Sequence, residues 1–173
     1  MSALHKCFEK YIDTNDMVLD LGFGSGRDLI KIYEITSNVY GLDSCAVFIE
    51  NMSKTMPVGH IGKTILPEIN LDGLNLIEKK FDVIVSIAVL MHLTLYDMER
   101  TIQNIKRSLG EKGIVIISYS LKRDIEDGRY FEDITKEIML SLFNKYGFQE
   151  IDSYMNNDSM NRKIQWVTQV LKL

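Results

Sequence analysis

Three glycines alternate with other residues in the segment Gly-Phe-Gly-Ser-Gly, at positions 22–26. An apolar run over residues 17–21 precedes this segment, and a helical pattern of apolar residues starts at Arg27. Glycine lets the backbone turn tightly and approach a ligand closely, and open α/β sheets bind ligands where such strands end. The segment therefore predicts a strand, a ligand-binding loop and a helix. Asp20, two positions ahead of the first glycine, disfavours an anion at the loop and tolerates a ligand with a cationic amino group.

A second carboxylate, Asp43, follows the next predicted strand, 21 positions after Gly22. A carboxylate at the end of a strand can accept hydrogen bonds from both hydroxyls of a ribose. Dinucleotide-binding loops instead space their glycines as G-x-G-x-x-G and seat a pyrophosphate on the helix N-terminus. The pattern therefore favours a nucleoside ligand other than a dinucleotide. A nicotinamide-dependent oxidoreductase is the alternative that the glycine spacing disfavours.

Three further side chains are candidates for the chemistry at this edge. His92 follows a buried strand predicted over residues 81–87, and an imidazole at a cleft edge can take a proton at neutral pH. Its alternative role is to pack or hydrogen-bond and so order the loop. Tyr119, at the end of a strand predicted over 113–119, and Arg129, in the loop beyond it, are predicted to contact the acceptor. Structural roles are the alternative for both.

The composition narrows the function classes. The 173 residues include 24 Asp and Glu against 20 Lys and Arg, whereas dedicated nucleic-acid binders carry a basic face. Cys7 and Cys45 lack the spacing of metal ligands, so we predict no metal site and two reduced thiols. The N-terminus lacks the apolar run of a signal peptide, and no apolar run approaches the ~20 residues that span a bilayer. We expect a cytoplasmic protein that binds neither nucleic acid nor membrane.

Strands and helices alternate along the chain and would position these residues. Strands are predicted at 17–21, 39–42, 59–66, 81–87, 113–119, 148–154 and 164–172, and helices at 3–11, 27–35, 44–54, 95–109 and 135–146. Ser44 and Thr94 are predicted to be helix N-caps. The last two strands are joined by a loop too short for a crossover helix, so they form an antiparallel hairpin. The result is one α/β domain over 1–173, with a short N-terminal helix in 1–16 and a doubly wound, mostly parallel sheet of about seven strands in 17–173.

In these segments the sequence resembles the class I S-adenosylmethionine-dependent methyltransferases. The matching segments are Val-Leu-Asp-Leu-Gly-Phe-Gly-Ser-Gly-Arg-Asp (18–28), Val-Tyr-Gly-Leu-Asp (39–43), Phe-Asp-Val-Ile-Val-Ser-Ile-Ala-Val-Leu-Met-His-Leu (81–93), Leu-Gly-Glu-Lys-Gly-Ile-Val-Ile-Ile-Ser (109–118) and Tyr-Gly-Phe (146–148). The resemblance implies a Rossmann-like fold and the cofactor S-adenosylmethionine, with S-adenosylhomocysteine as its product. It assigns to the cofactor pocket Asp20, Gly22, Gly24, Gly26, Arg27, Asp43, Ser44, Thr64, Ile65, Ser86 and Ala88.

Each of these residues has an implied role. The glycines would pack against the methionine part of the cofactor, Asp43 would bind the ribose, and Asp20 would meet the amino group directly or through water. Arg27 would reach the cofactor carboxylate, with a place on the helix surface as its alternative. Ser86 and Ala88 would line the sulfonium side.

Recognition of the adenine departs from the family pattern. The family often has an acidic or polar residue after the third strand, where this chain reads Lys-Thr-Ile-Leu-Pro at 63–67. Thr64, or the backbone near Ile65, is therefore expected to meet the adenine amino group.

By this resemblance the chain is predicted to methylate an unidentified acceptor, expected to be a small molecule. The alternative is a methyltransferase-fold partner or regulatory subunit with little or no catalysis of its own. Neither an Asn/Asp-Pro-Pro-aromatic segment nor a Pro-Cys pair follows residues 81–87, which argues against a DNA base methylase. Residues 1–16 are few for covering helices, so the cleft is expected to be open. Two alternatives follow: either the acceptor is large, or a mobile segment or a second subunit supplies the lid.

Overall fold

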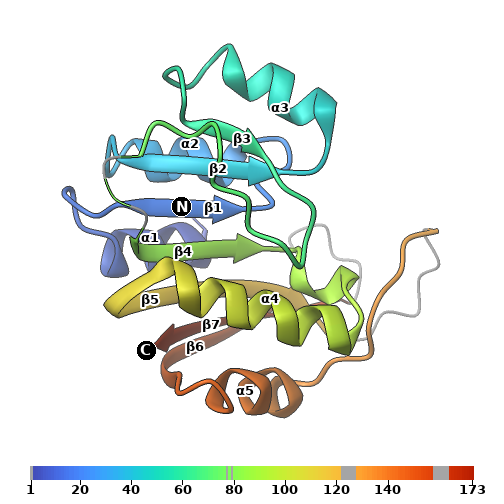
Figure 1. The fold of residues 1–173 in the computed structure, drawn as a ribbon. Coiled ribbons are helices and arrows are strands. Elements are labelled where there is room, and N and C mark those ends of the chain that lie inside the picture. Colours follow the sequence, from blue (N-terminus) through green and yellow to red (C-terminus); the bar gives the residue numbers. More distant parts are fainter. Residues whose placement is uncertain (1, 77, 79, 122–127, 158–163) are drawn as a thin grey trace.

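The computed structural model describes residues 2–76, 78, 80–121, 128–157 and 164–173 (Figure 1). Its helices are α1 (Ala3–Tyr11), α2 (Arg27–Tyr33), α3 (Ala46–Ser53), the 3₁₀ helix η1 (Leu90–His92), α4 (Leu95–Ser108) and α5 (Lys136–Asn144). Its strands are β1 (Val18–Leu21), β2 (Val39–Asp43), β3 (Ile61–Lys63), β4 (Phe81–Ile87), β5 (Leu109–Ser120), β6 (Gln149–Asn157) and β7 (Gln165–Lys172).

The seven strands form one sheet in the order β3-β2-β1-β4-β5-β7-β6. Strand β7 runs antiparallel to both β5 and β6, and the pairs from β3 to β5 are parallel. This confirms the predicted α/β sheet, mostly parallel with a C-terminal antiparallel hairpin. Because β1 lies between β2 and β4, the chain reverses its direction of travel across the sheet at β1. Such a switch point opens a crevice at the carboxyl ends of the strands.

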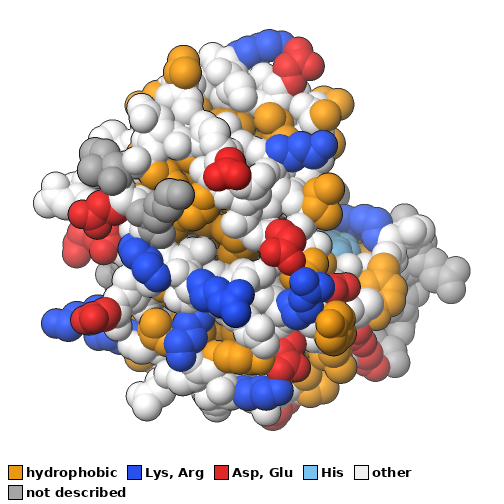
Figure 2. All heavy atoms as spheres, in the orientation of Figure 1, with side chains coloured by type: hydrophobic (Ala, Val, Ile, Leu, Met, Phe, Trp, Pro, Cys, Tyr) orange, Lys and Arg blue, Asp and Glu red, His pale blue; other side chains and the backbone are white. Residues whose placement is uncertain are grey.

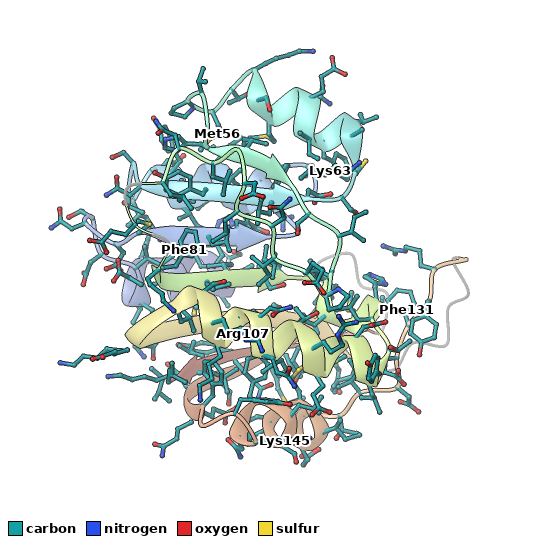
Figure 3. All side chains as sticks on the ribbon, in the orientation of Figure 1. Met56, Lys63, Phe81, Arg107, Phe131 and Lys145 are labelled. Atoms are coloured by element: carbon teal, nitrogen blue, oxygen red, sulfur yellow. The ribbon has the colours of Figure 1, made fainter. Side chains whose placement is uncertain are left out.

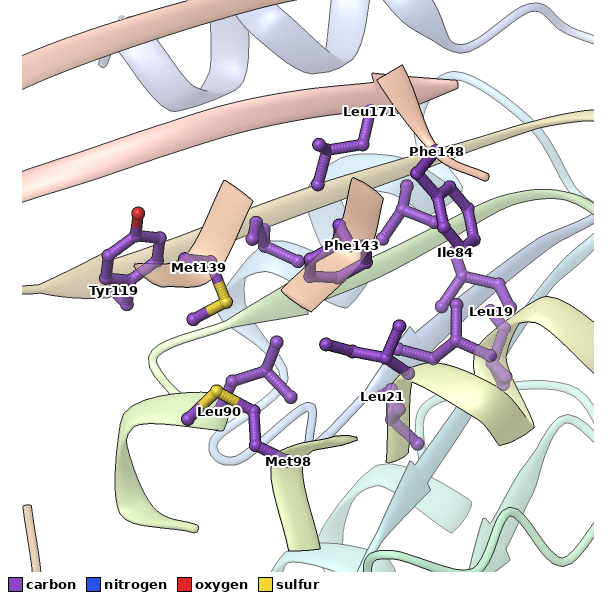
Figure 4. Close-up of a cluster of buried hydrophobic side chains, with 14 of the residues drawn as sticks. Leu19, Leu21, Ile84, Leu90, Met98, Tyr119, Met139, Phe143, Phe148 and Leu171 are labelled. Carbon is purple, nitrogen blue, oxygen red and sulfur yellow. The ribbon is translucent and has the colours of Figure 1, made fainter. Parts of the chain in front are cut away.

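Helices cover both faces of the sheet. In Figure 1, α4 and α5 lie in front of the sheet, and α1 and α2 lie behind it. Successive strand residues point to opposite faces. Leu19 and Ile84 pack in the cluster that includes Ile102 of α4 (Figure 4), whereas Val18 packs in the cluster that includes Phe8 of α1. Burial on both faces explains why the central strands read as continuous apolar runs.

The two predicted helix caps have different outcomes. Thr94 does cap α4, because its side chain accepts a hydrogen bond from the Asp97 amide. The prediction for Ser44 was wrong, because the residue at the N-cap of α3 is Cys45. The Cys45 amide donates to Asp43 Oδ1 at 2.8 Å, and this side-chain turn delays the start of the helix by one residue.

The segment between β3 and β4 contains turns but no helix among its described residues. The surface over α4 carries both signs of charge: in Figure 2, Lys and Arg side chains are interspersed with Asp and Glu. This mixture is typical of a solvated helix face. Within the described ranges, no helix is both long and apolar enough to cross a membrane.

Candidate functional site

A cavity of about 680 Å³ lies at the carboxyl ends of β1, β2 and β4, where the topology places a ligand. Small-molecule pockets occupy about 300–1,000 Å³. The predicted site residues that line it are Gly22, Gly24, Arg27, Asp43, Ser44, Thr64, Ile65, Ala88, His92 and Arg129. Those that are not among its lining residues are Asp20, Gly26, Ser86 and Tyr119. The structure therefore brings the glycine loop, the end of β2 and the segment after β4 together around one space.

Asp43 joins two of these segments. Its carboxylate is mostly buried, with 8% of the residue exposed, and it accepts the Gly24 amide on Oδ2 and the Cys45 amide on Oδ1, both at 2.8 Å. A carboxylate oxygen has two lone pairs, so each oxygen retains one for a ligand. Asp43 thus fixes the loop and the start of α3 while it presents acceptor capacity to the cavity.

The three glycines of the loop do different work. All three have a positive φ, between 56° and 82°. A Cβ on Gly22 would lie 2.4 Å from Val89, and one on Gly26 would lie 2.2 Å from the Met52 sulfur, so both positions are closed by the protein itself. A Cβ on Gly24 would meet no protein atom within 4 Å. Of the three, only Gly24 therefore leaves open space that a ligand could fill.

Asp20 lies beneath the loop and is 2% exposed. Its Oδ2 is the one buried side-chain oxygen or nitrogen without a hydrogen-bond partner in the described part of the chain. Burial raises the pKa of this carboxyl well above its ordinary value, and the nearby carboxylates of Asp28 and Asp43 raise it further. An unpartnered buried carboxylate is costly in the free protein and suits a cationic group placed above it.

Replacing Asp20 with asparagine is expected to raise the melting temperature of the ligand-free protein at neutral pH. Between the ordinary pKa of Asp20 and its raised pKa in the folded state, the folded protein holds a proton that the unfolded chain has released. The free energy of unfolding of the wild type therefore falls as pH rises through this window, and the variant loses this slope. Each 1 kcal/mol gained should raise the melting temperature by about 2–4 °C. Thermal melts from about pH 4 to about pH 8 measure it; curves that stay parallel would show that Asp20 titrates normally.

Arg27 lies at the outer rim of the cavity. Its side chain is 74% exposed and pairs with its neighbour Asp28, with Nη2 3.0 Å from Oδ2. The other oxygen of Asp28 lies 3.0 Å from Nε2 of His5, on the N-terminal helix. Arg27 therefore lies on the helix surface and also borders the cavity, and its contact with the cofactor carboxylate stays a prediction.

The predicted adenine end is more apolar than polar. The Thr64 hydroxyl is already engaged, since it donates to the Glu68 carbonyl at 2.6 Å and accepts the Asn70 amide at 3.0 Å. Ile65 is 66% exposed and lines the cavity beside Phe48 of α3. The Ile65 carbonyl likewise accepts one hydrogen bond, from the Glu68 amide at 3.1 Å, so Thr64 and the backbone near Ile65 both stay predicted partners of the adenine amino group.

The end of β4 carries backbone strain. Ala88 has a φ of 60°, a region that costs a residue with a Cβ about 1–2 kcal/mol. Its amide donates to the Ser118 carbonyl at 2.7 Å, which holds the chain in this turn while Ala88 borders the cavity. Ser86 is buried, and its hydroxyl donates to the Leu21 carbonyl at 3.1 Å. Ser86 therefore ties β4 to β1 and is not among the residues that line the cavity.

His92 is the last residue of η1 and lines the cavity. Its Nδ1 lies 2.8 Å from the Tyr130 carbonyl oxygen, and its ring packs on Phe131 with centroids 4.5 Å apart. A carbonyl oxygen only accepts, so Nδ1 carries a hydrogen and the neutral ring has its lone pair on Nε2. The Arg129 guanidinium lies over the Phe131 ring, with its carbon 5.4 Å from the ring centroid. Figure 3 shows Phe131 beyond the edge toward which the parallel strands point.

The prediction that Tyr119 faces the acceptor was wrong. Strand β5 continues to Ser120, so Tyr119 points to one face of the sheet rather than off its end. The residue is fully buried, and its hydroxyl donates to Gln169 Oε1 on β7 at 2.6 Å. Burial raises the pKa of this phenol, and the carboxylates of Glu150 and Glu137 raise it further. Tyr119 belongs to the core.

Sequence reasoning missed much of the cavity wall. The unforeseen lining residues are Phe23, Asp28, Leu42, Cys45, Phe48, Leu66, Ile87, Val89 and Leu93. Most are apolar, and several stand within one or two positions of a residue that was predicted. Apolar residues in the loops that follow strands, such as Phe23, Leu66 and Val89, were the signal by which part of this wall could have been predicted, because ligand pockets are lined mostly by apolar side chains.

Comparison with known proteins gives a family and a fold. A family model described as a methyltransferase domain matches residues 1–169. A search of curated proteins finds no match.

Three solved structures illustrate the likeness of fold. The Burkholderia thailandensis 1,6-didemethyltoxoflavin-N1-methyltransferase, with bound 1,6-didemethyltoxoflavin and S-adenosylhomocysteine, has a TM-score of 0.76 at 17% identity, over 97% of this chain and 75% of that one. The N-methyltransferase NodS from Bradyrhizobium japonicum, in complex with S-adenosylhomocysteine, has a TM-score of 0.71 at 16% identity, over 98% and 85%. An S-adenosylmethionine-dependent methyltransferase from Mesorhizobium loti has a TM-score of 0.73 at 15% identity, over 97% and 96%.

At such identities the solved structures establish the fold, and the family match, which spans nearly the whole chain, establishes membership. The chain belongs to the methyltransferase-domain family, which confirms the predicted class, an S-adenosylmethionine-dependent methyltransferase.

Proposed function

We propose that this chain binds S-adenosylmethionine at the glycine-loop end of the cavity and methylates a small molecule at the His92 end. The observation that supports this most is that one cavity borders both Asp43 and His92. The cofactor end and the candidate base are thus parts of the same space. A cavity volume of about 680 Å³ suits a cofactor together with a small acceptor, and it favours a small acceptor over a macromolecular one.

Three features of the chain fit this cofactor. The open side of Gly24 leaves room for a ligand against the loop backbone. The free lone pairs of Asp43 suit the ribose hydroxyls. The unpartnered oxygen of Asp20 suits a cationic amino group held above it. Two of the structural neighbours were crystallised with S-adenosylhomocysteine, which agrees with this assignment.

When bound, the cofactor supplies a methyl group already activated by a sulfonium. The chain then has to align the acceptor, exclude water and remove a proton where the acceptor is a hydroxyl or an ammonium. His92 is the side chain we assign to the proton, because the Tyr130 carbonyl occupies Nδ1–H and leaves the Nε2 lone pair free. Arg129 and the apolar residues Val89 and Leu93 would wall the acceptor end.

The test is a calorimetric titration of the purified protein with S-adenosylmethionine and S-adenosylhomocysteine. We expect binding of both, with one ligand per chain. If neither ligand binds at concentrations near a millimolar, the proposal fails, and the reading as a partner subunit takes its place. Binding of NADH in their stead would revive the oxidoreductase alternative.

Cys45 gives an independent measure of where the ligand lies. It is partly exposed and lines the cavity, whereas Cys7 is buried and burial raises its thiol pKa to about 12. N-ethylmaleimide should therefore modify Cys45 selectively. Saturating S-adenosylhomocysteine, at ten times its Kd, is expected to slow this reaction about tenfold. A Cys45→Ser variant controls for Cys7, and an unchanged rate in the presence of bound ligand would place the ligand elsewhere.

A further inference from the structure

Residues 129–132, here called the acceptor strap, run along η1 at the His92 end of the cavity. The strap is held by its backbone at two points. The Glu132 amide donates to the Met91 carbonyl at 2.9 Å, and the Tyr130 carbonyl accepts from His92 Nδ1 at 2.8 Å. Both contacts fall on η1, so the position of the strap and the orientation of the imidazole depend on each other.

The side chain of Glu132 fastens the strap to a second element, α4. Its Oε2 accepts the amide of Leu95, the first residue of the helix, at 3.0 Å. The first amides of a helix have no partner within the helix, and a carboxylate there also interacts favourably with the helix dipole. The same oxygen accepts the Tyr130 hydroxyl at 2.7 Å, so the residue that offers its carbonyl to His92 is also tied to Glu132.

These contacts form a continuous series of hydrogen bonds from α4 through Glu132 and Tyr130 to the His92 imidazole. Thr94 already caps α4 through the Asp97 amide, so the helix does not need Glu132 to begin. The bond from Glu132 to Leu95 therefore adds a second contact at the start of the helix, and it joins the strap to α4. The strap in turn carries the Tyr130 carbonyl that bonds to His92 Nδ1, and this carbonyl selects the nitrogen that carries the hydrogen.

We propose that Glu132 is a positioning residue that locks His92 in the tautomer with its lone pair on Nε2, toward the acceptor. This inference rests on the proposed function, because it concerns the group assigned there as the base. It adds that the acceptor strap is part of the catalytic architecture and that a carboxylate outside the cavity lining controls it.

The experiment reads the tautomer directly and needs no acceptor. Protein with ¹⁵N-labelled histidine is examined by NMR at neutral pH, and the three histidines are assigned with His5→Gln and His60→Gln variants. We expect the wild-type His92 to be in the Nδ1–H form and Glu132→Ala to show both tautomers. Glu132→Gln should restore the wild-type signal, because an amide oxygen can accept the same two hydrogen bonds. Glu111→Ala, which removes an exposed carboxylate near the start of β5, serves as the matched control.

Each outcome decides the proposal. If Glu132→Ala keeps the wild-type tautomer, Glu132 does not position His92. If Glu132→Ala fails to fold, Glu132→Asp carries the same test, because it keeps the charge and shortens the arm that reaches Leu95. A calorimetric titration with S-adenosylhomocysteine accompanies each variant and should give the wild-type Kd. Loss of the single tautomer in Glu132→Ala with intact cofactor binding supports the proposal. Absence of cofactor binding in the wild type contradicts the proposed function, but it does not change the tautomer result.

Discussion

Replacing Asp43 with alanine is expected to weaken the binding of S-adenosylmethionine and S-adenosylhomocysteine by about 10-fold to 150-fold. A hydrogen bond to a charged group contributes about 1.5–3 kcal/mol, and 1.4 kcal/mol corresponds to about tenfold in Kd. The substitution also removes the acceptors of the Gly24 and Cys45 amides, which orient the glycine loop and the start of α3. The loss therefore combines a missing ligand contact with a loosened pocket. Calorimetry of the variant beside the wild type measures it.

Two variants separate these contributions. Asp43→Asn keeps one oxygen as an acceptor and should lose less affinity than Asp43→Ala. Asp72→Ala removes an exposed carboxylate outside the cavity and should bind like the wild type. Equal affinity of Asp43→Ala and the wild type would show that the ribose does not lie at the end of β2, even if the cofactor binds.

The architecture could be predicted because its signals are local and repeated. Continuous apolar runs such as 81–87 are typical of strands buried on both faces, and the short link between the last two strands required a hairpin. The meeting of Asp43 and the glycine loop at one cavity could be predicted for the same reason, since parallel strands deliver both to one edge of the sheet.

Two residues were misplaced, each for a local reason. Tyr119 was expected at the edge because the predicted strand ended there, but β5 continues by one residue and turns it into the core. Ser44 was expected to cap a helix, but the Cys45 amide donates to the Asp43 carboxylate, and the helix begins one residue later. Contacts between residues far apart in the sequence, such as Glu132 with Leu95, could not be predicted, because neither residue type indicates its partner.

Replacing His92 with alanine is expected to lower kcat by about 10²–10⁴-fold, the usual contribution of a general base, while the Kd of S-adenosylmethionine stays unchanged. The cofactor contacts assigned to Asp43 and Gly24 come from other segments than η1, so the His92 variant retains them and binding should survive. The rate is measured as transfer of a radiolabelled methyl group to an acceptor that the wild type methylates.

His60 provides the matched control because it has the same local geometry in a different place. Its Nδ1 lies 2.8 Å from the Val39 carbonyl oxygen, and its ring stacks on Tyr40 with centroids 4.5 Å apart. It is not among the residues that line the cavity, so His60→Ala should affect stability and leave kcat in place. Full activity in His92→Ala would show that His92 is a packing residue and that the acceptor needs no base. Because the donor is already activated, an acceptor that reaches the site without its proton needs only alignment.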